Sequence, residues 1–251
     1  MPVVITEKKS PKITVVTLNR PERRNALTIE LLMELTAAIK TAETEADQRV
    51  LILRGAGFAF CTGLDLKAKG PVRATAEMVA KTLISLSQTR LITIAAVHGA
   101  AVAGGAGIMS ACDFVVAAKG TKIGYPEVRR GLVAGLVMTF LRRQVGERHL
   151  RELLLGSELI DAERAREIGL VNHVVAENEL MTKAQKIADS ALQAAPGALA
   201  QTKRLIEELW WSSVKQDVGL AQKYHLEARE SSEAQEGIAA FNEKRKPKWT
   251  T

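Results

Sequence analysis

The sequence predicts an α/β fold, and two features of its residue pattern indicate this class. Apolar strand-like runs alternate with helical segments through the first half of the chain, and a unit in which a buried strand ends in glycines and leads into a helix recurs. Beyond Gly131 the pattern becomes mostly helical. We therefore expect an α/β core that carries a C-terminal helical region, with no linker between the two.

The elements of the first half follow from apolar runs and their boundaries. A helix is expected over residues 27–46, where the apolar positions recur at helical spacing and Thr28 stands in position to cap it. Runs bounded by turn residues predict single strands or strand pairs at 12–20, 49–57, 91–97 and 113–127.

The second half is read in the same way. The segment "ELIDAERAREIGL" contains a helix that Asp161 can cap, and "VNHVV" at 171–175 is a short strand. Helical segments then fill 177–230, with an interruption near Pro196–Gly197.

Residues 91–112 contain no Asp, Glu, Lys or Arg, which calls for an explanation in a basic chain. A membrane span needs about 20 mainly apolar residues, but glycines and polar residues dilute this stretch. A dinucleotide-binding loop is weakly supported, because "GAGFAF" at 55–60 and "GAGIMS" at 105–110 both lack the third glycine. The remaining interpretation is a buried strand, a tight turn and a buried helix entered through glycines.

Composition narrows the functional class. Hydrophobic residues make up 47% and charged residues 25% of the 251 residues, which is typical of a globular protein. Only Cys61 and Cys112 are present, and no secretory signal is visible, so a reducing, cytoplasmic location is expected. The net charge of +7 fits a polyanionic ligand. No basic patch with interleaved aromatic residues is present, so a nucleic-acid module is not favoured.

Two glycine-rich loops could bind negative charge. A strand that ends in glycines and feeds a helix leaves backbone N–H groups free at the helix start, as expected at Gly104–Gly105. In "FCTGLDLK" at 60–67, Gly63 allows the backbone near Leu64 to approach a ligand closely. Two such loops aimed at one oxygen would form an oxyanion hole, although tight packing alone would explain the same glycines.

The chain resembles the enoyl-CoA hydratase/isomerase (crotonase) family over nearly its whole length. Segments that resemble the family occur in the family's order: "LNRPERRNAL" at 18–27, "GAGFAFCTGLDLK" at 55–67, "AAVHGAAVAGG" at 95–105, "ACD" at 111–113, "GYPEVRRGL" at 124–132, "LIDAERAREIGLVNHVV" at 159–175 and "EGIAAFNEKRKPKW" at 236–249. No single segment identifies the family, but the seven segments together, in the family's order and register, are a very specific match.

This resemblance implies a spiral of ββα turns over residues 1–195 and a helical region over 196–251, packed on the core or on a neighbouring subunit. It implies homotrimers or paired trimers. It also implies a coenzyme A thioester as ligand, with the carbonyl oxygen held by the backbone N–H groups that match Leu64 and Gly104. Residues that match family positions around the coenzyme A moiety are Arg23, Arg24, Lys67, Phe241 and Lys244. No separate cofactor is expected.

The expected catalytic acid is Glu127, in "GYPEV", which matches one of the two glutamates of family hydratases. Glu after Pro is also ordinary chemistry for the first turn of a helix. The other hydratase glutamate falls at Gly107, so this chain lacks it. One carboxylate is enough to move a proton between two carbons, as in a shift of a double bond from the 3 to the 2 position. The sequence therefore favours an isomerase over a hydratase.

Other residues leave alternatives open. Glu77 and Glu147 could replace the missing acid, although both are expected to face solvent, and Asp65 and Asp113 are interpreted as structural. The histidines have no spaced partners for a metal, so no metal site is expected. Where the family commonly has small and polar residues, this chain has Leu136, Val137 and Met138, which predicts a changed acyl pocket.

The competing functions are hydration of straight or branched 2-enoyl-CoA esters and, from another class, a non-catalytic member that binds acyl-CoA or RNA. Glu127 favours an enzyme, because a carboxylate beside an oxyanion hole serves no purpose in a protein that only binds.

Overall fold

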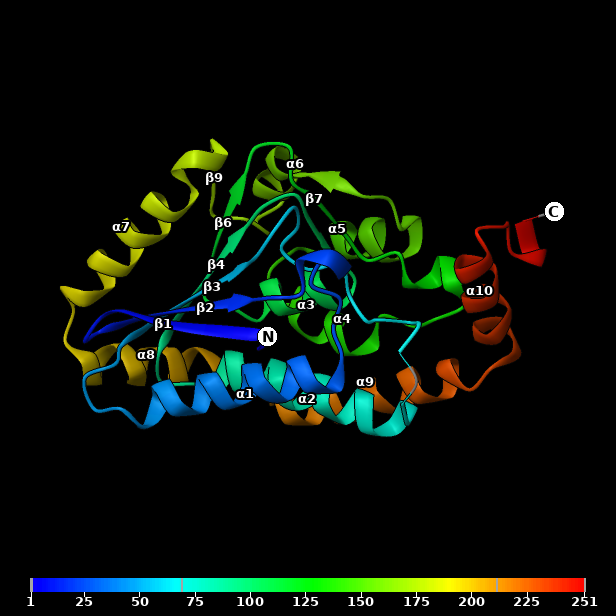
Figure 1. The fold of residues 1–251 in the computed structure, drawn as a ribbon. Coiled ribbons are helices and arrows are strands. Elements are labelled where there is room, and N and C mark those ends of the chain that lie inside the picture. The colour runs from blue at the N-terminus through cyan, green and yellow to red at the C-terminus, as the bar shows by residue number, and fades with distance from the viewer. Residues whose placement is uncertain (1, 69, 211, 251) are drawn as a thin grey trace.

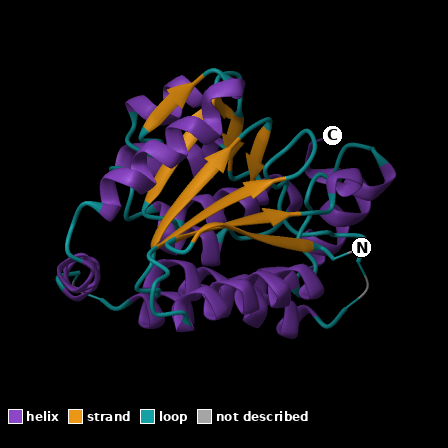
Figure 2. Cartoon of the chain, turned by 60° about the vertical axis from the view of Figure 1, so that its left-hand side comes forward, coloured by secondary structure: helices purple, strands orange, loops and turns teal. Residues whose placement is uncertain are grey.

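The computed structural model describes residues 2–68, 70–210 and 212–250, and these residues form two sheets surrounded by helices (Figures 1 and 2). The large sheet has the strand order β1-β2-β3-β4-β6-β9, in which β1 is antiparallel to β2 and the other neighbours are parallel. Its strands are β1 (Val4–Ser10), β2 (Ile13–Leu18), β3 (Val50–Gly55), β4 (Ile92–Val97), β6 (Phe114–Ala118) and β9 (His173–Val175). The small sheet contains β5 (Ala100–Val102), β7 (Lys122–Gly124) and β8 (Ile160–Asp161).

The chain passes repeatedly from the large sheet to the small sheet and then into a helix. β4 is followed by β5 and α3 (Gly104–Ser110), and β6 is followed by β7, the short helix η2 (Glu127–Arg130) and α4 (Gly135–Leu141). After β3 the second strand is reduced to one bridge, between Cys61 and Ala101. This repetition is the ββα spiral that the resemblance implied.

Helices cover both faces of the large sheet because its strands are apolar on both sides. Successive side chains of a strand point to opposite faces. In β3, Leu51 and Leu53 belong to the core that includes α1 (Ile29–Thr44) and α2 (Val72–Gln88). Val50 and Ile52 belong to a second core closed by α7 (Leu180–Leu192).

The C-terminal helices lie along the lower and right-hand sides of Figure 1. They are α8 (Pro196–Glu208), α9 (Val214–Arg229) and α10 (Ser232–Glu243). α9 packs against α2 and α4, and α10 packs against η2, so the C-terminal helices contact helices of the α/β core. The division between core and C-terminal region at residue 195 stays a prediction.

Most predicted elements are confirmed, and the caps explain their boundaries. Thr28 Oγ1 accepts a hydrogen bond from Leu31 N at 3.2 Å, and Asp161 Oδ1 accepts one from Arg164 N at 2.8 Å at the start of α6 (Ala162–Glu167). The uncharged stretch is β4, β5 and α3, and every residue of α3 is buried. The predicted interruption near Pro196 is the start of α8, since Pro fits the first turn of a helix.

Several elements were not predicted. Among them are β1, β5, β8, α2, α10, the break between α8 and α9, and the short segments α5 (Glu147–Arg151) and η3 (Glu152–Gly156). β5 has the sequence AAV within a stretch rich in Ala and Gly, residues that are not typical of strands. Within the described ranges, no helix has the length and apolarity that a bilayer crossing requires.

Candidate active site

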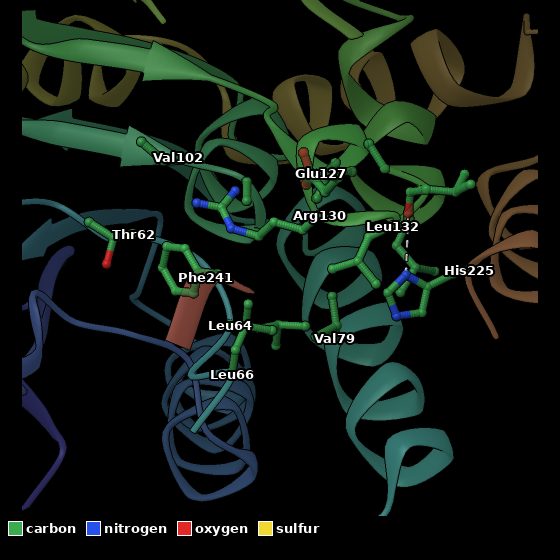
Figure 3. Close-up of a pocket in the computed structure, with 16 residues that line it drawn as sticks. Thr62, Leu64, Leu66, Val79, Val102, Glu127, Arg130, Leu132, His225 and Phe241 are labelled. Atoms are coloured by element: carbon green, nitrogen blue, oxygen red, sulfur yellow. Dashed lines mark hydrogen bonds between the residues drawn. The ribbon is translucent and has the colours of Figure 1, made fainter. Parts of the chain in front are cut away.

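One pocket brings together the loop 62–66, the start of α3, η2, α4 and the two last helices (Figure 3). In the close-up, Thr62 and Phe241 lie on one side, His225 lies on the other, and Leu64 lies between them. The lining is mostly apolar, with Glu127, Arg130 and His225 as the titratable exceptions among the described residues. A largely apolar pocket with a few convergent polar groups is the usual form of a small-molecule site.

Leu64 and Gly104 both line this pocket, on two loops that lie close together. A parallel bridge between Leu27 and Leu64 uses Gly63 O and Asp65 N, and therefore leaves the N–H of Leu64 outside the pairing. Gly104 is the first residue of α3, so its N–H has no intrahelical acceptor. A Cβ atom built on Gly104 would lie 3.8 Å from Leu64 N, which shows how close the two loops are.

The loops around these two N–H groups have unusual backbone conformations. Gly63 has φ +89°, and a Cβ atom there would lie 3.1 Å from Val102 O and 3.3 Å from Gly104 N. Ala103 has φ 51° and ψ −122°, a backbone conformation that residues other than glycine rarely adopt. Strain of this kind persists where the surrounding structure fixes it, often at functional sites. The geometry supports an oxyanion-binding role for this pair of loops.

Glu127 starts η2 and turns its carboxylate toward the pocket. Burial raises the pKa of Glu127 to about 7, and its own backbone N–H and the guanidinium of Arg130 offset this only in part. Its buried Oε2 has no hydrogen-bond partner among the described residues. A buried carboxylate with a free oxygen and a pKa near neutrality suits a group that takes up and returns protons.

Arg130 and Phe241 close the pocket beside Glu127. The Arg130 guanidinium carbon lies 4.3 Å from the centre of the Phe241 ring, a cation–π distance that ties α10 to η2. Phe241 was expected to reach the ligand from the C-terminal region, and here it lines the pocket of its own chain. Arg130 was not singled out in the sequence, where "VRR" looks like a solvated turn.

The acyl wall differs in part from the expectation. Leu136 and Val137 line the pocket, but Met138 is not among its lining residues and packs instead against the main core. This follows from helical geometry, because three consecutive residues of α4 cannot all face one side. Val137 also stands against Gly107 of α3, where a Cβ atom would come within 2.9 Å of Val137 Cβ.

The basic residues near residues 20–67 fall into two groups. Arg20 and Arg23 both bind the carboxylate of Asp65, with N–O distances of 3.3 and 3.1 Å. Burial raises the pKa of Asp65, but the hydrogen bonds from Arg23 and Arg20 outweigh this, and the net pKa lies below the ordinary value. Asp65 is therefore structural, as expected. Arg24 and Lys67 are exposed on the same two loops, outside the pocket itself.

Lys244 is exposed at the end of α10 with φ 56° and does not line the pocket.

The comparisons with known proteins agree with this geometry. Residues 8–251 match the family model described as enoyl-CoA hydratase/isomerase. The chain belongs to the enoyl-CoA hydratase/isomerase family. A putative enoyl-CoA hydratase from Thermus thermophilus is 38% identical over 94% of this chain and 97% of that protein. A solved putative enoyl-CoA hydratase from Mycobacterium avium paratuberculosis superposes with a TM-score of 0.91 at 29% identity, covering 99% of both chains.

A third relative is named differently. The solved carnitinyl-CoA hydratase from Mycobacterium avium matches with a TM-score of 0.89 at 28% identity, and covers 99% of this chain and 98% of its own. Members of this family with similar folds therefore carry names that refer to different acyl groups.

The other acids considered in the sequence do not enter the pocket of this family member. Glu77 is exposed on α2, and Glu147 is exposed and paired with Arg151 at 2.8 Å. Asp113 accepts hydrogen bonds from Thr93 N at 2.7 Å and from Lys203 Nζ at 2.7 Å, and thus holds β4, β6 and α8 together. Glu127 is the one carboxylate among the described pocket-lining residues.

His225 is, with Arg130, a polar pocket residue whose place the sequence did not reveal. It lies on α9, and its ring Nδ1 is 3.4 Å from Val133 O. Its spacing from Leu226 and Leu220 gave no signal, because a lone histidine on a helix reads equally well as a surface residue. Among the described residues, no group of His, Cys, Asp and Glu has a geometry that could hold a metal ion.

Proposed function

We propose that the protein moves the double bond of a 3-enoyl-CoA thioester to the 2 position through an enolate. The thioester oxygen would accept hydrogen bonds from the N–H groups of Leu64 and Gly104. Glu127 would remove a proton from C2, and the electron pair would delocalise onto the thioester oxygen and C4. The same carboxyl group would return the proton to C4. The observation that supports this assignment is a pocket with Glu127 as its one described carboxylate.

The energetics suit one carboxylate with two tasks. A positioned base contributes about 10²–10⁴ in rate, and one oxyanion-hole donor contributes ~10²–10³. Burial raises the pKa of Glu127 to about 7, so that the group accepts and releases a proton with similar ease near neutral pH. The apolar wall of Leu136 and Val137 disfavours water on the side where a second acid would stand.

Hydration of a 2-enoyl-CoA ester is the second candidate, because the relatives are mostly named enoyl-CoA hydratases. The experiment that separates the two follows the protein with a 3-enoyl-CoA and, separately, with a 2-enoyl-CoA of equal chain length. Chromatography of the products distinguishes double-bond migration from water addition. We expect migration to be faster. Brisk hydration without migration would establish the second candidate instead.

We further propose that Arg24, Lys67 and Lys244 bind phosphates of coenzyme A, with Arg23 and Phe241 shaping the approach, and that no separate cofactor takes part. The subunits would assemble as trimers or paired trimers. Exposed apolar side chains support assembly, since Phe58, Leu155 and Leu209 are 93%, 70% and 77% exposed in the single chain. Mass measurement in solution tests the assembly.

A further inference from the structure

A second pocket joins the candidate active site on the side of His225. It is bounded by the start of α1, the loop after Leu64, the first half of α2 and the end of α9. The two pockets share Leu64, Leu66 and His225, so they lie side by side with these three residues at their boundary. An acyl group that extends past Leu64 from the oxyanion site would point toward the second pocket.

The second pocket contains a guanidinium group, that of Arg229, which has no acidic partner among the described residues. Arg229 lies one helical turn after His225 on α9, and side chains at this spacing share a helix face. Within the described part of the chain, no ion pair or hydrogen bond joins Arg229 to a carboxylate. It is half-buried, and burial lowers the pKa of Arg229 without any neighbouring acid to restore it.

The other charged residues of this pocket do not neutralise Arg229. Asp65 is already occupied by Arg20 and Arg23, and Glu30 is exposed at the start of α1. His225 lies close enough to Arg229 for its positive charge to lower the pKa of the imidazole further, after the larger effect of burial. A half-buried arginine beside an imidazole, with no anion supplied by the described residues, fits an anionic ligand group.

We propose that the acyl group of the substrate carries a carboxylate at its far end, and that Arg229 binds it in this second pocket beside His225. The ligand class is thus an enoyl-CoA ester of a dicarboxylic acid. The thioester would lie at Leu64 and Gly104, and the distal carboxylate would accept hydrogen bonds from the guanidinium of Arg229, while the His225 ring keeps its Nδ1 on Val133 O. This inference rests on the proposed function, because it places the thioester carbonyl between the two loops.

Binding of two non-reacting esters tests the inference without requiring turnover. Adipyl-CoA and hexanoyl-CoA have the same chain length and differ in the terminal carboxylate. Hydrogen bonds to charged groups typically change affinity by about 10- to 100-fold. By calorimetry we expect adipyl-CoA to bind more tightly by about that factor, and Arg229→Gln to remove most of the difference. Equal affinities of the two esters for the wild type would overturn the inference.

Three further measurements sharpen the test. Arg229→Lys keeps the charge and should keep part of the preference, whereas Arg204→Gln, which changes an exposed arginine on α8, should keep all of it. Loss of the preference in Arg204→Gln would overturn the inference. The phosphates of coenzyme A are the other anionic source, so the esters are also compared without the 3′-phosphate. If the effect of Arg229→Gln vanishes with that phosphate, Arg229 binds coenzyme A and the inference fails.

Turnover separates this inference from the proposed function. If hexenoyl-CoA and its ω-carboxylate are both left unchanged by the protein while adipyl-CoA binds preferentially, the catalytic proposal fails and the distal carboxylate site stands. If hexenoyl-CoA and its ω-carboxylate react with equal kcat/KM, and adipyl-CoA and hexanoyl-CoA bind with equal affinity, the catalytic proposal stands and the distal site fails.

Discussion

The side chain of Val137 on α4 fills the space into which a side chain at Gly107 on α3 would project. A Cβ atom on Gly107 would lie 2.9 Å from Val137 Cβ, closer than packed side chains tolerate, whereas its distance of 3.4 Å from Val137 Cα would be an ordinary contact. α3 and α4 are thus held together at a position where the resemblance implied a second glutamate in hydratases. Val137 lines the pocket and also fills the space that a glutamate side chain at position 107 would need. The residue at position 137 therefore bears on whether a second carboxylate can be present.

The first prediction concerns Glu127. Glu127→Gln should lower kcat for double-bond migration by about 10²–10⁴, because the amide keeps the size of the side chain but cannot accept a proton from carbon. Binding of a saturated acyl-CoA should change little by calorimetry. Glu77→Gln is the matched control, since Glu77 is exposed on α2 and outside the pocket. Retention of most activity in Glu127→Gln would show that this residue is structural.

The second prediction concerns pH. The pKa of Glu127 is raised to about 7, and the proposed reaction needs the ionised form. The kcat/KM for a 3-enoyl-CoA should therefore rise as the pH passes through about 7 and level off above it. The positive charge of Arg130 partly lowers the pKa of Glu127, so Arg130→Met should move this rise to higher pH. Arg130→Lys keeps the charge and should leave the rise nearly in place. A profile flat from pH 5 to 9 would contradict the assignment.

The third prediction separates the basic residues near the pocket. Arg24→Gln and Lys67→Gln should weaken binding of an acyl-CoA, and the loss should shrink at high salt, because exposed charges are screened beyond a Debye length of about 10 Å at 0.1 M. Their thermal stability should not change. Arg23→Gln should also lower the melting temperature, because Arg23 binds the buried carboxylate of Asp65.

The control for this third prediction is Lys186→Gln. Lys186 is exposed on α7, on the face of the sheet away from the pocket. Equal weakening in Lys186→Gln would mean that only the net charge of the protein matters.

The glycine loops of the candidate site were easier to predict from the sequence than the side chains that form the pocket walls. Gly63 and Gly104 could be found because close approach of two loops requires glycine, and that requirement is local in the sequence. The contact between Gly107 and Val137 could not be found, because it depends on how two helices distant in the sequence, α3 and α4, pack against each other. The resemblance also placed Leu136, Val137 and Met138 together at the acyl pocket, which the helical period of α4 does not allow for three consecutive residues.

The polar residues on α9 could not be assigned to a pocket from the sequence for a related reason. His225 and Arg229 stand on a helix with many polar and charged residues, so their type and spacing resemble a solvated face. Only the packing of α9 against α2 and α4 turns them toward the pocket. The short strand β5 was missed because its Ala- and Gly-rich segment has no strand propensity of its own, and its strand character comes from pairing with β7.

The fourth prediction uses the contact between Gly107 and Val137 to test why hydration is disfavoured. Gly107→Glu alone should destabilise the protein, by about 1–3 kcal/mol or more for an overpacked core, since the new Cβ collides with Val137. Shortening Leu136 should not relieve this, because the collision involves Val137. Even Val137→Ala would keep the Cβ atom that stands in the way, so Val137→Gly is the change that opens the space.

The double variant Gly107→Glu with Val137→Gly should therefore recover part of the stability that Gly107→Glu loses, measured as melting temperature. It should also gain water addition to a 2-enoyl-CoA relative to the wild type, because a second carboxylate would then stand across the pocket from Glu127 with room for water. Val137→Gly alone serves as the control, since it opens the wall without adding an acid. If Val137→Gly alone hydrates as fast as the double variant, access of water rather than the missing carboxylate limits the reaction. If the double variant is stable and still adds no water, a carboxylate at position 107 does not supply the second acid, and the proposed reason for favouring isomerisation is wrong.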